Sequence, residues 1–426
     1  MADIVPLLTL LIIAIIVVIV STRIRFPYTA ALVLLGAAIG LLGQRFGPLA
    51  SLRADETLFS TGFFFNVLLP PIIFEAAIHI DFRQLRARAP LILFLVFVGV
   101  IFTTAFTGLL VSWIAGIPLL VALLLAAILS PTDPIAVVDL FRRLKVPSEL
   151  ATIVESESLL NDAVGVITFL VILGVLTGGG WSAAGVTLQF VQLTFGGIAI
   201  GLLAAGGVYV LHRHLNDPAV ETALSIVVAY GSFLAAQSVG ASGIIATSIA
   251  GIAVGTWIAP RAMDAAVQHT VSTFWGVIIY VVNSIIFLSM GLLVAVSNLP
   301  ANLFLIALVF ATLVLGRGAF VYVHRPLATA LRGPGARLPA SWYNVLTMAG
   351  IRGAIPVVLA LSLVTSSAPL SAGLESSIAS VVIGVALASV VAGNLVADWY
   401  VRRTFGAREG TELADEEFPP LGSEAP

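Results

Sequence analysis

Long apolar runs recur from one end of the chain to the other, and they restrict the sequence to folds that a lipid bilayer can hold. Thirteen runs begin at about residues 4, 28, 57, 90, 117, 149, 184, 218, 241, 268, 300, 341 and 372. Most extend for about 17 to 25 residues, long enough for an α-helix to cross a hydrocarbon core of about 30 Å. Because a helix satisfies its own backbone hydrogen bonds in lipid, these runs predict an all-α polytopic membrane protein with about 13 transmembrane helices.

The composition supports this interpretation and excludes several kinds of function. Of the 426 residues 59% are hydrophobic and 10% are charged, and the mean hydropathy is +1.11. The absence of cysteine excludes disulfides, thiolate nucleophiles and cysteine-ligated metals. The five histidines lie near the ends of runs and lack metal-ligand spacing. With a net charge of −2 and no basic patch interleaved with aromatic residues, no nucleic-acid partner is expected.

The positive charges alternate from one connection to the next. Every second connection, starting with the first, carries basic residues, and together with the C-terminal tail they hold 16 of the 20 Lys and Arg residues: Arg23, Arg25, Arg83, Arg86, Arg88, Arg142, Arg143, Lys145, Arg213, Arg261, Arg325, Arg332, Arg337, Arg402, Arg403 and Arg408. The other connections carry only Arg45 and Arg53. This bias predicts an outside N-terminus and a cytoplasmic C-terminus.

The two ends of the chain lead to separate expectations. The first run has no basic residue before it and no small-residue cleavage site after it, so we expect a retained membrane helix. Residues 1–400 are predicted to form one membrane domain. Residues 401–426 are predicted to form a short cytoplasmic tail without stable structure, because the stretch is largely acidic and contains Pro and Gly.

Two runs contain residues that break helices. The fifth contains "LSPTDPIAV", in which Pro131 and Pro134 flank Asp133, and the twelfth contains "MAGIRGAIPVV", with glycines on both sides of Arg352. Because the two runs are seven apart, the first six and the last six would form an inverted repeat joined by the seventh. Paired broken helices in corresponding positions indicate a transporter with a binding site near the middle of the membrane.

Near its start, the sixth run contains "ESESLLNDAV", residues 155–164, which carries charge into the membrane. Asp162 lies about 20 Å along this helix, near mid-membrane. Helical geometry places it on one stripe with Glu155 and Ser158, and places Glu157 and Asn161 on a neighbouring stripe.

Depth also suggests partners and roles for these charges. Glu157 matches Arg317 of the eleventh run in depth, so the two could form a buried ion pair that fixes helix packing, serves the site, or both. No basic residue lies on the stripe of Asp162, and a carboxylate removed from water can hold either a proton or a desolvated cation. Near the cytoplasmic end of its run, Glu155 could face an entrance.

The remaining intramembrane acids leave alternatives open. Asp133, with Ser130 and Thr132, lies among carbonyl groups that the prolines leave free to coordinate a cation or orient neighbours. Glu75, in "LLPPIIFEAAIHI", is either a site residue or an acid at the cytoplasmic interface. Glu221 follows Asp217 and Pro218, so its place at a helix start explains it.

The motifs "SPTDPIAV", "ESLLNDAVG" and "GIRGAIPV", at these separations in a chain of thirteen runs, resemble the NhaP/NHE branch of the monovalent cation/proton antiporters. The resemblance covers residues 4 to 400. It implies the NhaA-like antiporter fold, with inverted repeats and crossing broken helices in spans 5 and 12. A core of spans 4–6 and 11–13 would move against spans 1–3 and 7–10, which would also form a homodimer.

The resemblance also implies roles for individual residues. It implies that Asp162 binds the cation or the proton and that Asn161 helps to order the site. Ser158 and Thr132 would help to ligate Na⁺, together with Asp162 and with Glu75 on the cytoplasmic approach. Glu157 would pair with an arginine, of which Arg317 is the first candidate, and Arg352 and Asp133 would stabilise the crossing of the broken helices.

The function that follows is electroneutral exchange of Na⁺ or Li⁺ for H⁺ in the cell membrane, by alternating access around Asp162 and without a cofactor. A K⁺-preferring exchanger is the first alternative, because sequence does not fix selectivity. A cation channel is a further alternative, and it would need a continuous pore through the membrane. An intramembrane aspartyl hydrolase could use Asp133 and Asp162 as an acid/base pair, but the sequence lacks a "GxGD" stretch.

Overall fold

The computed structural model describes residues 4–24, 26–42, 61–133, 141, 146–178, 182–212, 217–293, 299–332, 338–365 and 372–405. No β-strand occurs among these residues. Several basic residues used for the topology prediction lie outside the described residues: Arg25, Arg45, Arg53, Arg142, Arg143, Lys145, Arg213, Arg337 and Arg408. Pro134 of the first break and residues 406–426 of the predicted tail also lie outside them.

The first half of the chain consists of helices whose starts follow the predicted runs. They are α1 (Ile4–Ile24), α2 (Tyr28–Leu42), α4 (Thr61–Phe63), η2 (Phe64–Leu68), α5 (Leu69–Ile78), α6 (Phe82–Leu93), η3 (Phe94–Val98), α7 (Gly99–Ala115), α8 (Leu119–Ile128) and α10 (Ser148–Leu176). The segments η2 and η3 are π-helical turns within longer helices.

The second half continues in the same way. It contains α11 (Ala183–His212), α12 (Pro218–Ser238), α13 (Gly243–Ala253), η4 (Val254–Ile258), α14 (Ala259–Ala262), α15 (Ala265–Leu293), η6 (Pro300–Asn302), α16 (Leu303–Arg332), α17 (Ala340–Met348), α18 (Ala354–Thr365), α19 (Ala372–Ala388), η8 (Ser389–Gly393) and α20 (Asn394–Phe405). Eight helices in the described part of the chain are long and apolar enough to cross a membrane. The all-helical membrane fold is therefore confirmed, whereas the number of thirteen spans stays a prediction.

Two boundaries differ from the prediction because local interactions extend a helix. The carboxylate of Asp81 accepts hydrogen bonds from the backbone N–H groups of Arg83 and Gln84, so α6 starts at Phe82 and contains arginines that were expected in a connection. At the other end, α20 continues to Phe405, where Arg402 Nε donates to Asp398 at 2.7 Å, one turn earlier. Residues 401–405 of the predicted tail are thus helical.

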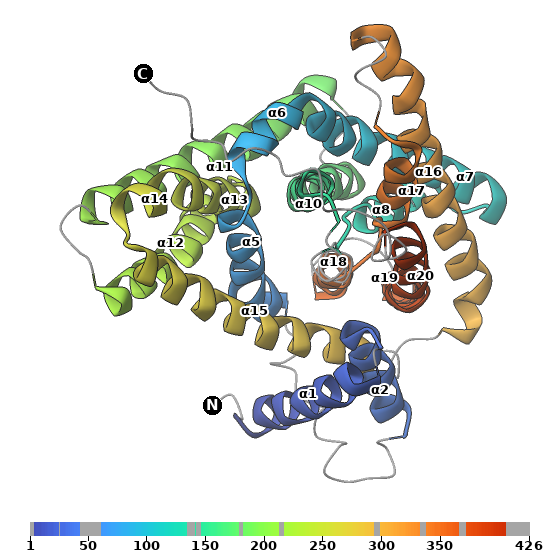
Figure 1. Ribbon diagram of the computed structural model, residues 1–426. Helices are drawn as coiled ribbons and strands as arrows, with labels where there is room; N and C mark the ends of the chain where they lie inside the picture. The colour runs from blue at the N-terminus through green and yellow to red at the C-terminus, as the bar shows by residue number, and fades with distance from the viewer. Residues whose placement is uncertain are drawn as a thin grey trace.

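The helix α10 lies in the middle of the molecule (Figure 1). Helices α11, α12, α13 and α14 lie on one side of it, and α7, α8, α16, α17, α19 and α20 lie on the other. The long helix α15 runs along the edge of both groups and packs against α2, α5 and α12, with further contacts to α18 and α19. This arrangement leaves the two broken spans beside α10.

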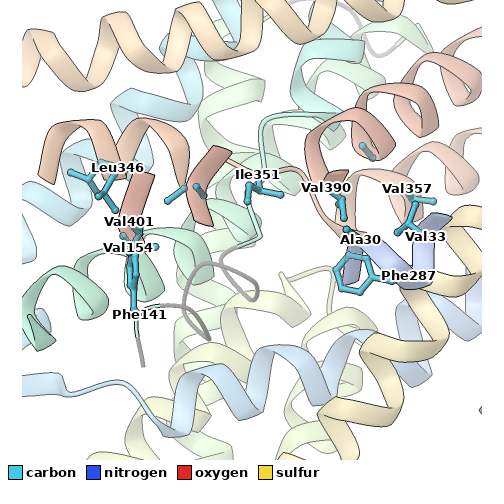
Figure 2. Packing of buried hydrophobic residues seen from close by; sticks show 14 of the residues in the cluster. Ala30, Val33, Phe141, Val154, Phe287, Leu346, Ile351, Val357, Val390 and Val401 are labelled. Carbon is cyan, nitrogen blue, oxygen red and sulfur yellow. The ribbon is translucent and has the colours of Figure 1, made fainter. Parts of the chain in front are cut away.

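The apolar side chains are distributed as a membrane protein requires. Figure 2 shows part of the largest buried cluster, in which Phe287 of α15 lies beside Ala30 of α2 and which also includes Val154 of α10 and Val401 of α20. Large apolar side chains also cover the outside, and Trp113 is 81% exposed. Such an apolar exterior would favour aggregation in water, but it suits contact with lipid.

Helices α2 and α15 approach each other closely at two glycines. A Cβ atom added to Gly291 would lie 2.7 Å from the Ala37 nitrogen and 2.8 Å from the Gly36 Cα. Without side chains at this point, the two backbones gain van der Waals contact along their length, as small residues allow in membrane helix pairs.

We expect Gly291→Ala to lower the melting temperature of the purified protein, because the added methyl group must push α2 away from α15. Overpacking of this kind costs about 1–3 kcal/mol. Gly276→Ala on the same helix is the matched control, since nothing lies within 4 Å of an added Cβ atom there. Equal melting temperatures for the two variants in detergent would contradict the close approach.

Candidate functional site

The first helix break follows Ile128, where α8 ends. Ser130 to Asp133 have no helical backbone, and Ser130 and Thr132 are buried. Pro131 packs on α10 at Gly165, where an added Cβ atom would lie 2.6 Å from the proline Cγ. The break therefore rests directly on α10.

Side chains of α10 satisfy the polar groups that this break exposes. The Asn161 amide accepts from the Thr132 backbone N–H at 3.2 Å and donates to the Thr132 hydroxyl at 2.6 Å. The Ser158 hydroxyl donates to the Thr132 carbonyl, and the Thr132 hydroxyl is 3.5 Å from Ser158 Oγ. Because unpaired backbone groups are costly in a membrane, these contacts explain how α8 can end there.

The second break joins α17 to α18 and is satisfied by different partners. Residues 350–353 have no helical backbone. The Arg352 backbone N–H donates to Ser389 Oγ at 2.8 Å, and the Gly350 carbonyl accepts from Arg352 Nη1 at 2.7 Å. Ser389 is the first residue of the π-helical turn η8, so an irregularity in α19–α20 presents it to the break.

The two breaks contact each other. The Asp133 backbone N–H donates to the Ile351 carbonyl at 2.7 Å. Gly353 faces the Asp133 side chain so closely that an added Cβ atom would lie 2.5 Å from the carboxyl carbon. The second break thus supplies a hydrogen-bond acceptor for a backbone N–H of the first. Only glycine fits at position 353.

Glu157 and Arg317 form a buried ion pair across α10 and α16. Arg317 Nη1 and Nη2 donate to Glu157 Oε1 and Oε2 at 3.0 and 2.9 Å, and the two side chains are 12% and 3% exposed. The pair is further held by Arg317 Nε, which donates to the Leu346 carbonyl at 2.9 Å, and by Asn161, which donates to Glu157 at 2.9 Å. Such bidentate geometry is the favourable form of a buried pair.

Arg352 adds a second buried guanidinium group beside this pair. It is 3% exposed and, with Arg317, faces Gly350, where an added Cβ atom would lie 3.2 Å from Arg352 Nη1. Both arginines line a small cavity closed by Phe310, Leu313, Val314, Thr347, Gly350 and Ser389. The Arg352 Nε atom has no hydrogen-bond partner among the described residues.

Asp162 differs from its neighbours on α10 because nothing in the described part of the chain holds its carboxylate. Asn161, Glu157 and Ser158 are buried, whereas Asp162 is half-buried. Its carboxylate has no hydrogen bond or ion pair with a described residue, and the charges that act on it are the carboxylates of Asp133 and Glu157. A half-buried carboxylate among other acids is stabilised by a bound proton or cation.

Glu75 and Glu221 lie on other helices than the residues described so far. Glu75 lies on α5, where its carboxylate is 3.4 Å from His79 Nδ1, and His79 Nε2 is 3.0 Å from the Ser272 hydroxyl. Glu221 is buried in the first turn of α12, after the capping residue Asp217. Among the described residues, no group of three His, Asp or Glu side chains could hold a metal ion. A cation beside Asp162 would therefore need hydroxyl and carbonyl oxygens as well.

Among the residues that the structure describes, the charges around the breaks leave a net charge of −1. The cluster comprises three acids, Asp133, Glu157 and Asp162, and two bases, Arg317 and Arg352. With all five ionised, a single negative charge remains. One proton or one monovalent cation would neutralise it.

Sequence reasoning missed the groups that complete the second break. No sequence motif marks Ser389 or the carbonyl groups of Leu346 and Ile351. Only folding brings them to the arginines and to Asp133. The interrupted helix itself was a signal that backbone groups there need partners, but it did not identify them.

The chain is similar to known proteins over most of its length. Residues 8–402 match the family described as "Sodium/hydrogen exchanger, transmembrane". The chain is 32% identical over 341 residues to the Na⁺/H⁺ antiporter ApNhaP of Aphanothece halophytica, covering 79% of this chain and 63% of that protein. It is 30% identical over 382 residues to the low-affinity Na⁺/H⁺ antiporter NhaS1 of Synechocystis sp., covering 89% and 69% of the two chains.

A solved structure shares the fold. The sodium proton antiporter MjNhaP1 of Methanocaldococcus jannaschii superposes with a TM-score of 0.75 at 20% identity, covering 94% of this chain and 97% of that one. The all-helical antiporter fold is therefore shown for this protein.

We expect Arg317→Gln to destabilise the protein strongly, because it leaves Glu157 buried without its counter-charge, at a cost of about 3–5 kcal/mol. Adding Glu157→Gln should restore part of the melting temperature. Arg402→Gln is the control, since its pair with Asp398 is exposed and such pairs contribute about 1 kcal/mol or less. A double variant no more stable than Arg317→Gln would contradict the pairing energetics.

Proposed function

The chain belongs to the family of transmembrane sodium/hydrogen exchangers, and from this membership and the geometry around Asp162 we propose that it is a secondary active antiporter that exchanges Na⁺ for H⁺. The chain spans only 63% of the length of the Aphanothece halophytica relative. The activity is therefore argued from the residues around the breaks. Family membership favours transport over intramembrane hydrolysis by Asp133 and Asp162.

The observation that carries the proposal is the contrast between Asp162 and its surroundings. Thr132, Ser158, Asn161 and Glu157 are joined by hydrogen bonds into one network, whereas the Asp162 carboxylate has no such partner in the described part of the chain. Thr132 and Ser158 offer oxygens for Na⁺, and Asn161 orders the network. Because hydrogen bonds hold the surrounding network in place, Asp162 can bind and release its ligand without rearranging these neighbours.

Charge balance supports a one-for-one exchange. Because the cluster of five ionised residues carries one net negative charge, it becomes neutral with one Na⁺ or with one H⁺ bound. A neutral cluster crosses the low-dielectric interior at lower cost than a charged one. The empty, charged state would then be the one least able to reorient, which prevents uncoupled leak.

Alternating access requires two parts that move relative to each other. We assign α6, α7, α8, α10 and α16 to α20 to the moving core, and α1 to α5 with α11 to α15 to the other part, which would form a homodimer. The position of α10 between two groups of helices is consistent with this division (Figure 1). Glu75 on α5 would meet cations on the cytoplasmic approach, in a protein of the cell membrane with the N-terminus outside and the C-terminus inside.

We expect Asp162→Asn to abolish exchange. In everted vesicles with a dye that reports the pH gradient, Na⁺ or Li⁺ should collapse the gradient for wild type and not for the variant. Glu149→Gln on the same helix is the matched control, since Glu149 pairs with Arg88 away from the breaks and should retain activity. Exchange by Asp162→Asn at the wild-type rate would refute the role of Asp162, and a response to K⁺ alone would identify the alternative substrate.

We expect competition between proton and cation to set the pH dependence. Acidification should raise the apparent KM for Na⁺, by up to about tenfold per pH unit when one proton excludes one Na⁺. In proteoliposomes clamped with K⁺ and valinomycin, the rate should not change with membrane potential. A rate that follows the potential would show that the exchange moves net charge and would contradict the charge balance.

A further inference from the structure

Two aromatic side chains meet where α6 begins, and each has an arginine one helical turn further along its own chain segment. The ring centroids of Phe82 and Trp257 are 5.3 Å apart, in an edge-to-face arrangement. Arg86 follows Phe82 by four residues, and Arg261 follows Trp257 by four. The four residues connect α6 to the segment η4–α14, which are distant in sequence.

The arginines of this surface have spare hydrogen-bonding capacity. Arg83, Arg86 and Arg261 are exposed, and none of them forms an ion pair with a residue that the structure describes. Arg261 Nη1 donates to the backbone carbonyl of Trp257 at 3.1 Å, one helical turn earlier. By contrast, the nearby Arg88 is paired with Glu149.

Two acids, Asp81 and Asp264, are close to these arginines in sequence. The Asp81 carboxylate is occupied by the backbone N–H groups of Arg83 and Gln84 and by the Gln84 side chain. Asp264 directly precedes α15. The three arginines exceed the two acids, and the start of α6 adds the positive end of a helix dipole.

The position of the surface points to the membrane boundary. The continuous helix Phe82–Ala115 has 34 residues, so it is about 50 Å long and exceeds a hydrocarbon core of about 30 Å. Its first turns therefore extend into the headgroup region. Trp257 is 43% exposed, and tryptophan at this depth commonly contacts lipid, while arginine attracts anionic headgroups.

We propose that Phe82, Arg86, Trp257 and Arg261 bind the headgroup of an anionic phospholipid, with Arg83 at the rim. The two guanidinium groups would contact the phosphate, and the exposed face of Trp257 would contact the upper part of an acyl chain. The lipid would bridge α6 and η4–α14 at the bilayer surface. This inference does not depend on the transported ion.

The test measures the lipid beside Trp257 directly. Purified protein is reconstituted into bilayers containing brominated phosphatidylglycerol or brominated phosphatidylcholine, and the quenching of Trp257 is obtained as the difference between wild type and Trp257→Phe. We expect phosphatidylglycerol to be preferred by up to about thirtyfold, from two arginine contacts at a membrane surface. Inorganic phosphate should not displace it, because the acyl-chain contact is missing.

The double variant Arg86→Gln/Arg261→Gln should lose this preference while it elutes as wild type in gel filtration. Arg403→Gln is the matched control: Arg403 is also exposed, and its guanidinium carbon lies 5.5 Å from the ring of Trp399. It should leave the preference at Trp257 intact. Equal quenching by the two lipids in wild type, or an unchanged preference in the double variant, would overturn the proposal. Displacement by inorganic phosphate would also overturn it.

Discussion

Inside a bilayer, every backbone group and every charge must find a partner within the protein, and this constraint explains the structure around the two helix breaks. The Asp133 N–H bonded to the Ile351 carbonyl joins the breaks. Side chains of α10 satisfy the first break, and Ser389 satisfies the second. The ion pair of Glu157 with Arg317 fixes α10 to α16 at the same place. With these contacts made, the interruptions can persist at a depth where isolated ones could not.

The same constraint explains why one group stands apart. After the contacts of Asn161, Ser158 and Glu157 are formed, the cluster retains one net negative charge, and the Asp162 carboxylate has no partner within the described residues to remove it. In the proposed function, a ligand of one positive charge removes it. In the proposed cycle, this charge balance makes the proton and Na⁺ mutually exclusive ligands of the same oxygen atoms.

The fold could be predicted because short stretches of the sequence determine where helices form and where they stop. Apolar runs predict helices, and the prolines around Asp133 and the glycines around Arg352 predict where two helices stop. The candidate site residues stay a prediction. Of the contacts around them, depth suggested the pair of Glu157 with Arg317 but not the others. Helical spacing places Asn161 beside Glu157, but it cannot show that the Asn161 amide holds the Thr132 backbone, or that Ser389 caps the second break. Those contacts join elements far apart in the chain, and only packing determines them.

The most direct test of the central claim counts the protons that Na⁺ displaces from the purified protein. Na⁺ is added to the protein in weakly buffered detergent solution, and released protons are measured across a pH series in wild type and in Asp162→Asn. If one carboxylate serves both ligands, wild type releases up to one proton per chain in the pH range where Asp162 is protonated, and the variant releases none. Release of the same number of protons by both proteins would show that another group exchanges the proton.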